Sequence, residues 1–156
     1  RLNLGYSWFM AGIGKVTSDA WTGENAGMAV RNYMEGALAR VSEGDVPVWY
    51  GWFLETIVIP NATIFSYLVA WGEVLVGISL IIGLLTGISA FFGALMNISF
   101  LLAGTVSTNP IMFIIAILLI MAWKVAGWYG LDRWALPLLG TPWTIANKTT
   151  KEKISA

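Results

Sequence analysis

Four polar side chains stand within, or at the end of, the long apolar stretches of this sequence. Glu73, Asn97 and Lys124 are each flanked by uncharged, mostly hydrophobic residues, and Lys15 ends the first apolar stretch. A carboxyl, an amide and an amine can donate or accept hydrogen bonds and, for the ionisable groups, exchange protons. Ionisable residues inside such stretches mark proton relays or substrate pathways in membrane proteins, because a charge in hydrocarbon is unfavourable. These residues are the first candidates for a functional site.

The composition favours a membrane protein. Of the 156 residues, 57% are hydrophobic and only 12% are charged, whereas a soluble domain has about 45–50% apolar and about 25% charged residues. Three stretches approach or exceed the roughly 20 apolar residues that cross a bilayer. The formal net charge is zero, so nothing indicates a nucleic-acid partner. We expect a multi-pass protein of the cell membrane, with the lipid bilayer as its first partner.

The chain contains no cysteine and no histidine. Thiolate catalysis and iron–sulfur ligation are therefore excluded, and the usual ligands of haem, zinc and copper are missing. We expect no covalently bound cofactor and no metal site. A redox role would require a diffusible cofactor, such as a quinone, or one held by a partner subunit.

The apolar stretches predict an all-α fold, an integral membrane four-helix bundle. The expected spans are residues 1–15, 62–85, 88–104 and 111–131. The polar segment 16–60 is expected outside the cytoplasm, with an amphipathic helix within residues 25–41. Residues 1–147 would form a single membrane domain and 148–156 a polar cytoplasmic tail. The lysines and arginines favour a cytoplasmic location for both termini.

Three of the polar residues are predicted to share one layer of the bundle. At 1.5 Å per residue, Glu73 and Asn97 lie about 16–17 Å below the outer membrane boundary and Lys124 about 20 Å below it. Small residues accompany Glu73 and Asn97 on their helix faces, which lets membrane helices approach closely. The layer therefore predicts that Glu73 and Lys124 form a pair or a proton relay.

Lys124 and Asn97 also have purely structural interpretations. The Lys124 side chain can reach toward the cytoplasmic interface, and Asn97 can serve only as a hydrogen-bonding contact between helices. Trp71 and Trp123 flank the predicted layer, where they would stack on an aromatic ligand or simply pack in the core.

Several segments resemble motifs of the DoxX/DoxD family. "RLNLGYSWFMAGIGK" at residues 1–15 resembles the pattern of its first helix, and "WGEVLVGISLIIGLLTGISAFFGALMN" at 71–97 resembles its central pattern. "STNP" and "GLDRWALPLLGTPW" resemble the closing elements of one branch. The family consists of small four-helix membrane proteins, and its DoxD branch is a subunit of thiosulfate:quinone oxidoreductase. The positions carried over by these motifs are Gly5, Gly12, Lys15, Glu73, Gly77, Gly83 and Thr86.

The polar layer and the resemblance together predict a quinone-linked oxidoreductase subunit. Lys124 and Asn97 would donate hydrogen bonds to the quinone carbonyls, and Glu73 would relay protons. The further predicted ligand contacts are Trp71, Trp123 and Lys15. The electron donor would bind outside the cytoplasm, near Lys15 and residues 16–60.

Two other functions remain open. The chain can be a non-catalytic structural or accessory subunit of a larger membrane redox or energy-conversion complex, in which the polar layer only sets the helix register. A small transporter ranks third, because only Pro60 and Pro110, at helix starts, suggest the broken helices of that class. The first two functions both imply other membrane or extracytoplasmic subunits as partners.

Overall fold

The computed structural model describes residues 1–141, and within this range the chain is helical and has no β-strand. The helices are α1 (Leu2–Val16), α2 (Asp19–Thr22), α3 (Met28–Ala39), α4 (Val48–Phe53), the π-helix η1 (Leu54–Val58), α5 (Ala62–Ile82), α6 (Thr86–Leu102), α7 (Asn109–Met121), α8 (Trp123–Ala126) and α9 (Asp132–Leu138). The predicted all-α class is confirmed. The predicted tail, residues 148–156, lies outside the described residues.

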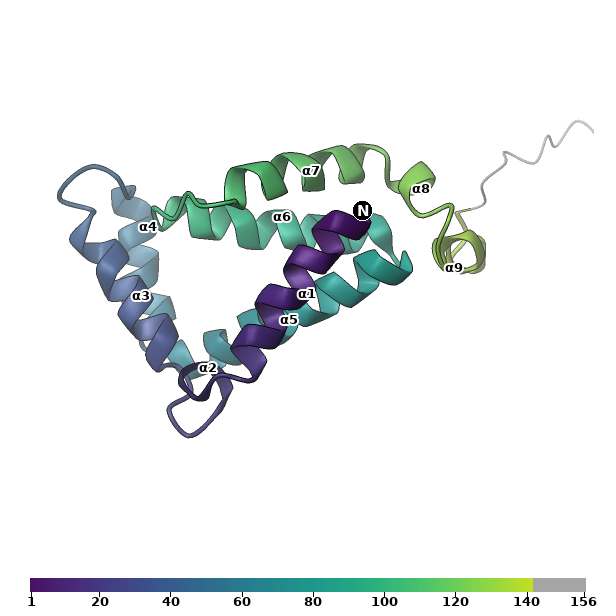
Figure 1. Ribbon diagram of the computed structural model, residues 1–156. Helices are drawn as coiled ribbons and strands as arrows, with labels where there is room; N and C mark the ends of the chain where they lie inside the picture. Colours follow the sequence, from purple (N-terminus) through teal and green to yellow (C-terminus); the bar gives the residue numbers. More distant parts are fainter. Residues whose placement is uncertain (142–156) are drawn as a thin grey trace, which may run out of the picture.

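The four long apolar helices form two pairs. Helix α1 packs along α5, and α7 packs along α6. As Figure 1 shows, α5 and α6 diverge from their shared turn, and α3 and α4 close the third side of a triangle. The N-terminus lies near α8, at the end of the molecule where α5 meets α6. The helical segment between α1 and α5 therefore occupies the opposite end.

Glycines bring the backbones of α1 and α5 into contact. A Cβ atom added to Gly12 would lie 2.6 Å from the backbone nitrogen of Val74, and one added to Gly77 would lie 2.5 Å from that of Phe9. A side chain at these positions would require the two backbones to separate. Close approach through small residues, which the sequence predicts for this face of α5, is therefore how this pair packs.

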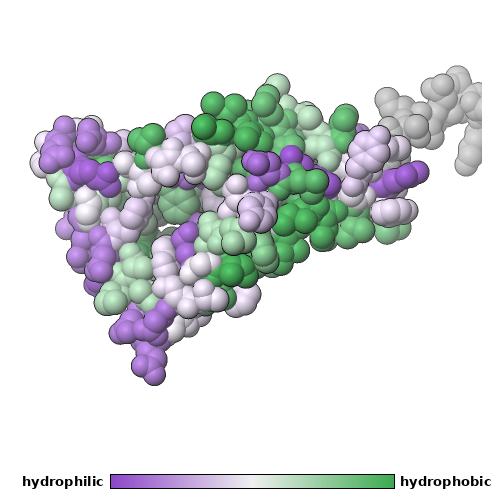
Figure 2. Space-filling view, in the orientation of Figure 1, coloured by the Kyte–Doolittle hydropathy of each residue, from purple (hydrophilic) through white to green (hydrophobic). Residues whose placement is uncertain are grey.

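The outer face of α5 is apolar and exposed. A stripe of exposed residues recurs every three or four positions: Ile64, Leu68, Trp71, Leu75, Ile78 and Ile82. In the described part of the chain, α5 is the one helix long and apolar enough to cross a membrane, and α6 and α7 are shorter apolar helices. Figure 2 shows hydrophobic surface over α7, whereas hydrophilic residues gather over α2 and α3. Apolar surface of this extent requires a cover, which a bilayer can supply.

The predicted fourth span, 111–131, is not one continuous helix. Helix α7 ends at Met121, Ala122 leaves the helical conformation, and α8 adds one short turn. Neither glycine nor proline stands within five residues of Met121, so the sequence carries no local signal for this break. The chain changes direction where Trp123 packs against Gly87. The contact is close: a Cβ atom added to Gly87 would lie 2.8 Å from the Cβ atom of Trp123.

Asp132 holds the turn between α5 and α6. Its side chain is buried, and its Oδ1 and Oδ2 atoms accept hydrogen bonds from the backbone N–H groups of Leu85, at 2.5 Å, and Thr86, at 2.8 Å. The first N–H groups of a helix have no partner inside that helix, and a negative charge is favourable there. Asp132 therefore caps α6 from a distant part of the chain.

We expect Asp132→Ala to lower the free energy of unfolding by about 2 kcal/mol, because two amide groups lose their acceptor. Thermal unfolding of the purified protein in detergent measures the effect. Asp45→Ala, at an exposed position, is the matched control and should leave the melting temperature unchanged. Equal melting temperatures for the two variants would contradict the capping role.

Candidate functional site

An ion pair joins α1 to α5. The Nζ atom of Lys15, in the last turn of α1, lies 2.6 Å from the Oε2 atom of Glu73. Glu73 is 1% exposed and the Lys15 side chain 21%. The ammonium group also lies 5.2 Å from the centre of the Trp21 ring, which adds a cation–π contact. The close approach at Gly12, one helical turn before Lys15, brings the two charged side chains within reach.

This ion pair lines a cavity of about 440 Å³. The cavity lies between α1, α3 and the start of α7, and Figure 2 shows the surface hollowed between α3 and α1. Its aromatic walls are Trp8, Trp21, Tyr33 and Phe100, and the hydroxyl and amide groups of Thr108 and Asn109 add polar character. A mainly apolar pocket of this volume with a few convergent polar groups is typical of a small-molecule site.

Helix α3 is tied to the loop that follows α6. The hydroxyl groups of Tyr33 and Thr105 share a hydrogen bond. The guanidinium group of Arg40 donates to the carbonyls of Ala103, at 2.7 Å, and Gly104, at 2.8 Å, and so caps the C-terminal end of α6. The wall of the cavity is therefore built by contacts between segments more than 60 residues apart.

Two buried polar side chains, one on α1 and one on α6, have no hydrogen-bond partner among the described residues. Both amide atoms of Asn97 and the Nε1 atom of Trp8 are of this kind, and the two residues are 0% and 2% exposed. Trp8 Nε1 lies beside Gly93, one turn before Asn97 on α6. Unpartnered buried polar groups are rare, and a water molecule or a ligand usually satisfies them. Of the two residues, Trp8 lines the cavity, so a hydrogen-bond donor is left unused in the cavity wall.

Glu73 and Asn97 occupy similar heights, as the sequence predicts. They lie on α5 and α6, and both are buried. Their neighbours in sequence, Gly72 and Met96, are in contact, since a Cβ atom added to Gly72 would lie 3.7 Å from the Met96 sulfur. The structure does not show a hydrogen bond between the two side chains within the described residues. The amide remains available to a third group.

The prediction that Lys124 lies beside Glu73 is wrong. The contact between Trp123 and Gly87 sets Lys124 at the level of the first turn of α6, beside the α5–α6 turn. Glu73 lies about 15 Å further along α5, at 1.5 Å per residue. The Lys124 ammonium group lies instead 5.4 Å from the centre of the Trp123 ring. The depth estimate fails because it counts α5 and α7 from a common outer boundary, whereas the packing of α7 along α6 sets Trp123 beside Gly87.

The predicted aromatic contacts are separated as well. Trp71 is 49% exposed on the outer stripe of α5 and does not line the cavity beside Glu73. Trp123 lines a different cavity, at the other end of α6. Of the predicted site residues, the structure therefore brings together Glu73 and Lys15, with Asn97 at the same level.

Sequence reasoning missed the four aromatic residues of the cavity wall, Trp8, Trp21, Tyr33 and Phe100. Trp8 lies seven residues before Lys15, and this spacing puts both on one helix face, so periodicity within α1 contained the signal. Trp21 and Tyr33 belong to the polar segment, and nothing local indicates that they turn toward α1. Among residues 1–141, no three acidic side chains gather closely enough to hold a metal ion.

Comparisons of this chain with protein-family models, with curated proteins and with solved structures find no match. Over residues 1–141, the fold and the site define a helical protein with one helix long and apolar enough to cross a membrane and with a partly buried ion pair in the wall of a cavity. The resemblance to the DoxX/DoxD family stays a prediction from the sequence motifs.

Proposed function

We propose that this chain is the quinone-linked subunit of a membrane oxidoreductase, with a role like that of the DoxD branch. The quinone head group binds in the cavity beside Lys15 and Glu73. One observation carries this proposal: a charged pair with its carboxylate fully buried faces an aromatic-walled cavity of about 440 Å³. Such a site offers ring stacking, a hydrogen-bond donor and a source of protons in one place.

The proposed membrane arrangement has four spans, α1, α5, α6 and α7, with both termini in the cytoplasm. The apolar stripe of α5 supports it, as do the exposed apolar residues of the other helices, such as Phe91, Phe92 and Ile114. The polar segment with α2 and α3 then lies outside the cytoplasm. Helices α1, α6 and α7 are short for a bilayer of about 30 Å, which local thinning accommodates.

The chemistry proposed for the cavity is proton-coupled quinone reduction. A quinone gains two electrons and two protons and becomes a quinol. The Lys15 ammonium group donates a hydrogen bond to one carbonyl oxygen and then a proton to the reduced oxygen. The Glu73 carboxylate takes up a proton from water and passes it to the Lys15 amine, which then delivers the second proton in the same way. The unpartnered Trp8 N–H is a second donor beside the cavity. The electrons come from a reduced-sulfur donor, as the resemblance implies, or from a partner subunit.

The test is quinone reduction by the purified protein with thiosulfate as electron donor and decylubiquinone as acceptor. We expect Glu73→Gln to lower kcat at least 100-fold, the usual contribution of a group that transfers protons. Glu35→Gln, at an exposed position on α3, is the matched control and should retain full activity. Inactivity of the unmodified protein, with and without a co-purified partner, would refute the proposal.

A second candidate is a non-catalytic subunit of a larger complex. The observation in its favour is the surface of α4, where Val48, Trp49 and Trp52 are exposed. Aromatic side chains of this kind are enriched at protein interfaces and at membrane surfaces. Purification in a gentle detergent distinguishes the candidates, because stable co-migration with other subunits and no retained quinone would favour the accessory role.

A further inference from the structure

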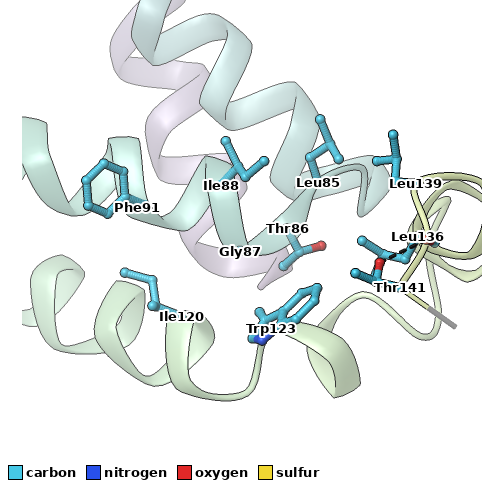
Figure 3. A pocket seen from close by; sticks show the side chains of 10 residues that line it. All are labelled: Leu85, Thr86, Gly87, Ile88, Phe91, Ile120, Trp123, Leu136, Leu139 and Thr141. Atoms are coloured by element: carbon cyan, nitrogen blue, oxygen red, sulfur yellow. Dashed lines mark hydrogen bonds between the residues drawn. The ribbon is translucent and has the colours of Figure 1, made fainter. Parts of the chain in front are cut away.

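A second cavity of about 440 Å³ lies at the end of the molecule opposite the ion pair. Figure 3 shows it between the first turns of α6, the end of α7, Trp123 of α8, and α9. Its walls are hydrocarbon, from Ile88, Phe91, Ile120, Leu136 and Leu139. We call it the α6–α9 crevice. Ile88, Phe91 and Leu139 are each more than half exposed, so the crevice opens onto the apolar outer face of α6.

A positive charge lies next to Trp123, which lines this crevice. Trp123 forms one wall, and the Lys124 ammonium group lies 5.4 Å from the centre of its ring. Within residues 1–141, no acidic side chain forms an ion pair with Lys124. The Lys124 ammonium group, which lies within an apolar run of the sequence, is thus beside a hydrocarbon cavity and has no anionic partner among the described residues.

The crevice also contains an unused hydrogen-bond donor. Thr86 is 0% exposed, and its Oγ1 atom has no partner among the described residues. Figure 3 shows this oxygen on the side of Thr86 that faces Leu136 and Thr141 across the crevice. A buried hydroxyl group without a partner indicates a missing acceptor. A ligand for this place therefore combines a hydrocarbon chain, a hydrogen-bond acceptor and a negative charge.

We propose that the α6–α9 crevice binds one acyl chain of an anionic phospholipid whose phosphate group contacts Lys124. The chain fills the apolar walls, and an ester carbonyl accepts the Thr86 hydrogen bond. The Lys124 ammonium group neutralises the phosphate at the membrane surface, where basic residues attract anionic lipids. The inference rests on the membrane placement within the proposed function, but it is independent of the quinone chemistry at Lys15 and Glu73.

The test compares lipid retention by native mass spectrometry after reconstitution with equal amounts of dioleoyl phosphatidylglycerol and dioleoyl phosphatidylcholine. We expect the unmodified protein to retain the anionic lipid with a preference of about five-fold, the size of the attraction of one lysine to an anionic surface. Lys124→Met should abolish this preference and Lys124→Arg should keep it. Arg31→Met, which removes an exposed cation from α3, is the matched control and should change nothing.

A second pair of variants tests the crevice itself. Ile88→Trp fills the opening and should reduce the number of retained lipids, whereas Ile111→Trp, at an exposed position of α7 that does not line the crevice, should not. An unchanged preference in Lys124→Met, or retention of a quinone instead of a phospholipid in the crevice, would overturn the inference.

Quinone reduction in the same preparations separates this inference from the proposed function. We expect Lys124→Met to reduce quinone at the unmodified rate, because Lys124 is remote from Glu73. Lipid preference without quinone reduction in the unmodified protein refutes only the proposed function. Quinone reduction without lipid preference refutes only the lipid site.

Discussion

Replacing Gly77 with alanine is expected to lower the free energy of unfolding by about 2–4 kcal/mol, and the melting temperature by roughly 5–15 °C. The added methyl group would lie 2.5 Å from the backbone nitrogen and 2.6 Å from the Cα atom of Phe9. A backbone cannot rotate away as a side chain can, so α1 and α5 must move apart. Their separation also draws Lys15 away from Glu73.

Two glycines of the same helices serve as matched controls for Gly77→Ala. Gly14, on α1, has nothing within 4 Å of an added Cβ, and Gly72, on α5, has only the Met96 sulfur at 3.7 Å. Alanine at these positions should leave stability unchanged or increase it by up to about 1 kcal/mol, because alanine favours the helix. Thermal unfolding in one detergent compares the three variants. Similar melting temperatures for Gly77→Ala and Gly14→Ala would contradict the close contact.

Lys15→Met is expected to destabilise the protein by about 3–5 kcal/mol, the usual result of removing one partner of a buried ion pair. The change leaves the Glu73 carboxylate, which is 1% exposed, without its cation. The double variant Lys15→Met/Glu73→Gln should recover most of this stability, because it removes the unpaired charge as well. Equilibrium unfolding of the single and double variants gives the coupling between the two residues as a double-mutant cycle.

In this double-mutant cycle, we expect quinone reduction and the free energy of unfolding to respond differently. We expect quinone reduction to be lost in both single variants and in the double variant, since proton transfer requires both charged groups. Arg31→Met, at an exposed position, controls for the loss of a cation and should change neither quantity much. A double variant as unstable as Lys15→Met would show that the ion pair is not the source of the effect.

The helical class of this protein follows from its sequence alone. Apolar runs of this length must satisfy their backbone hydrogen bonds internally, which favours helices. The inward face of α5 follows in the same way, because Ser66, Ala70 and Gly77 recur at helical spacing and are all buried. The similar heights of Glu73 and Asn97 also follow, because their two helices are joined by a short turn from which residues can be counted in both directions.

The partner of Glu73 and the place of Lys124 are decided only by the tertiary structure. Lys15 meets Glu73 because Gly12 and Gly77 let α1 approach α5, and residue spacing within one helix does not specify the height of its neighbour. Lys124 leaves the predicted layer because α7 packs along α6 with Trp123 beside Gly87. The helical period and the rise per residue are local properties of one helix, whereas a contact between two side chains on different helices depends on how those helices pack.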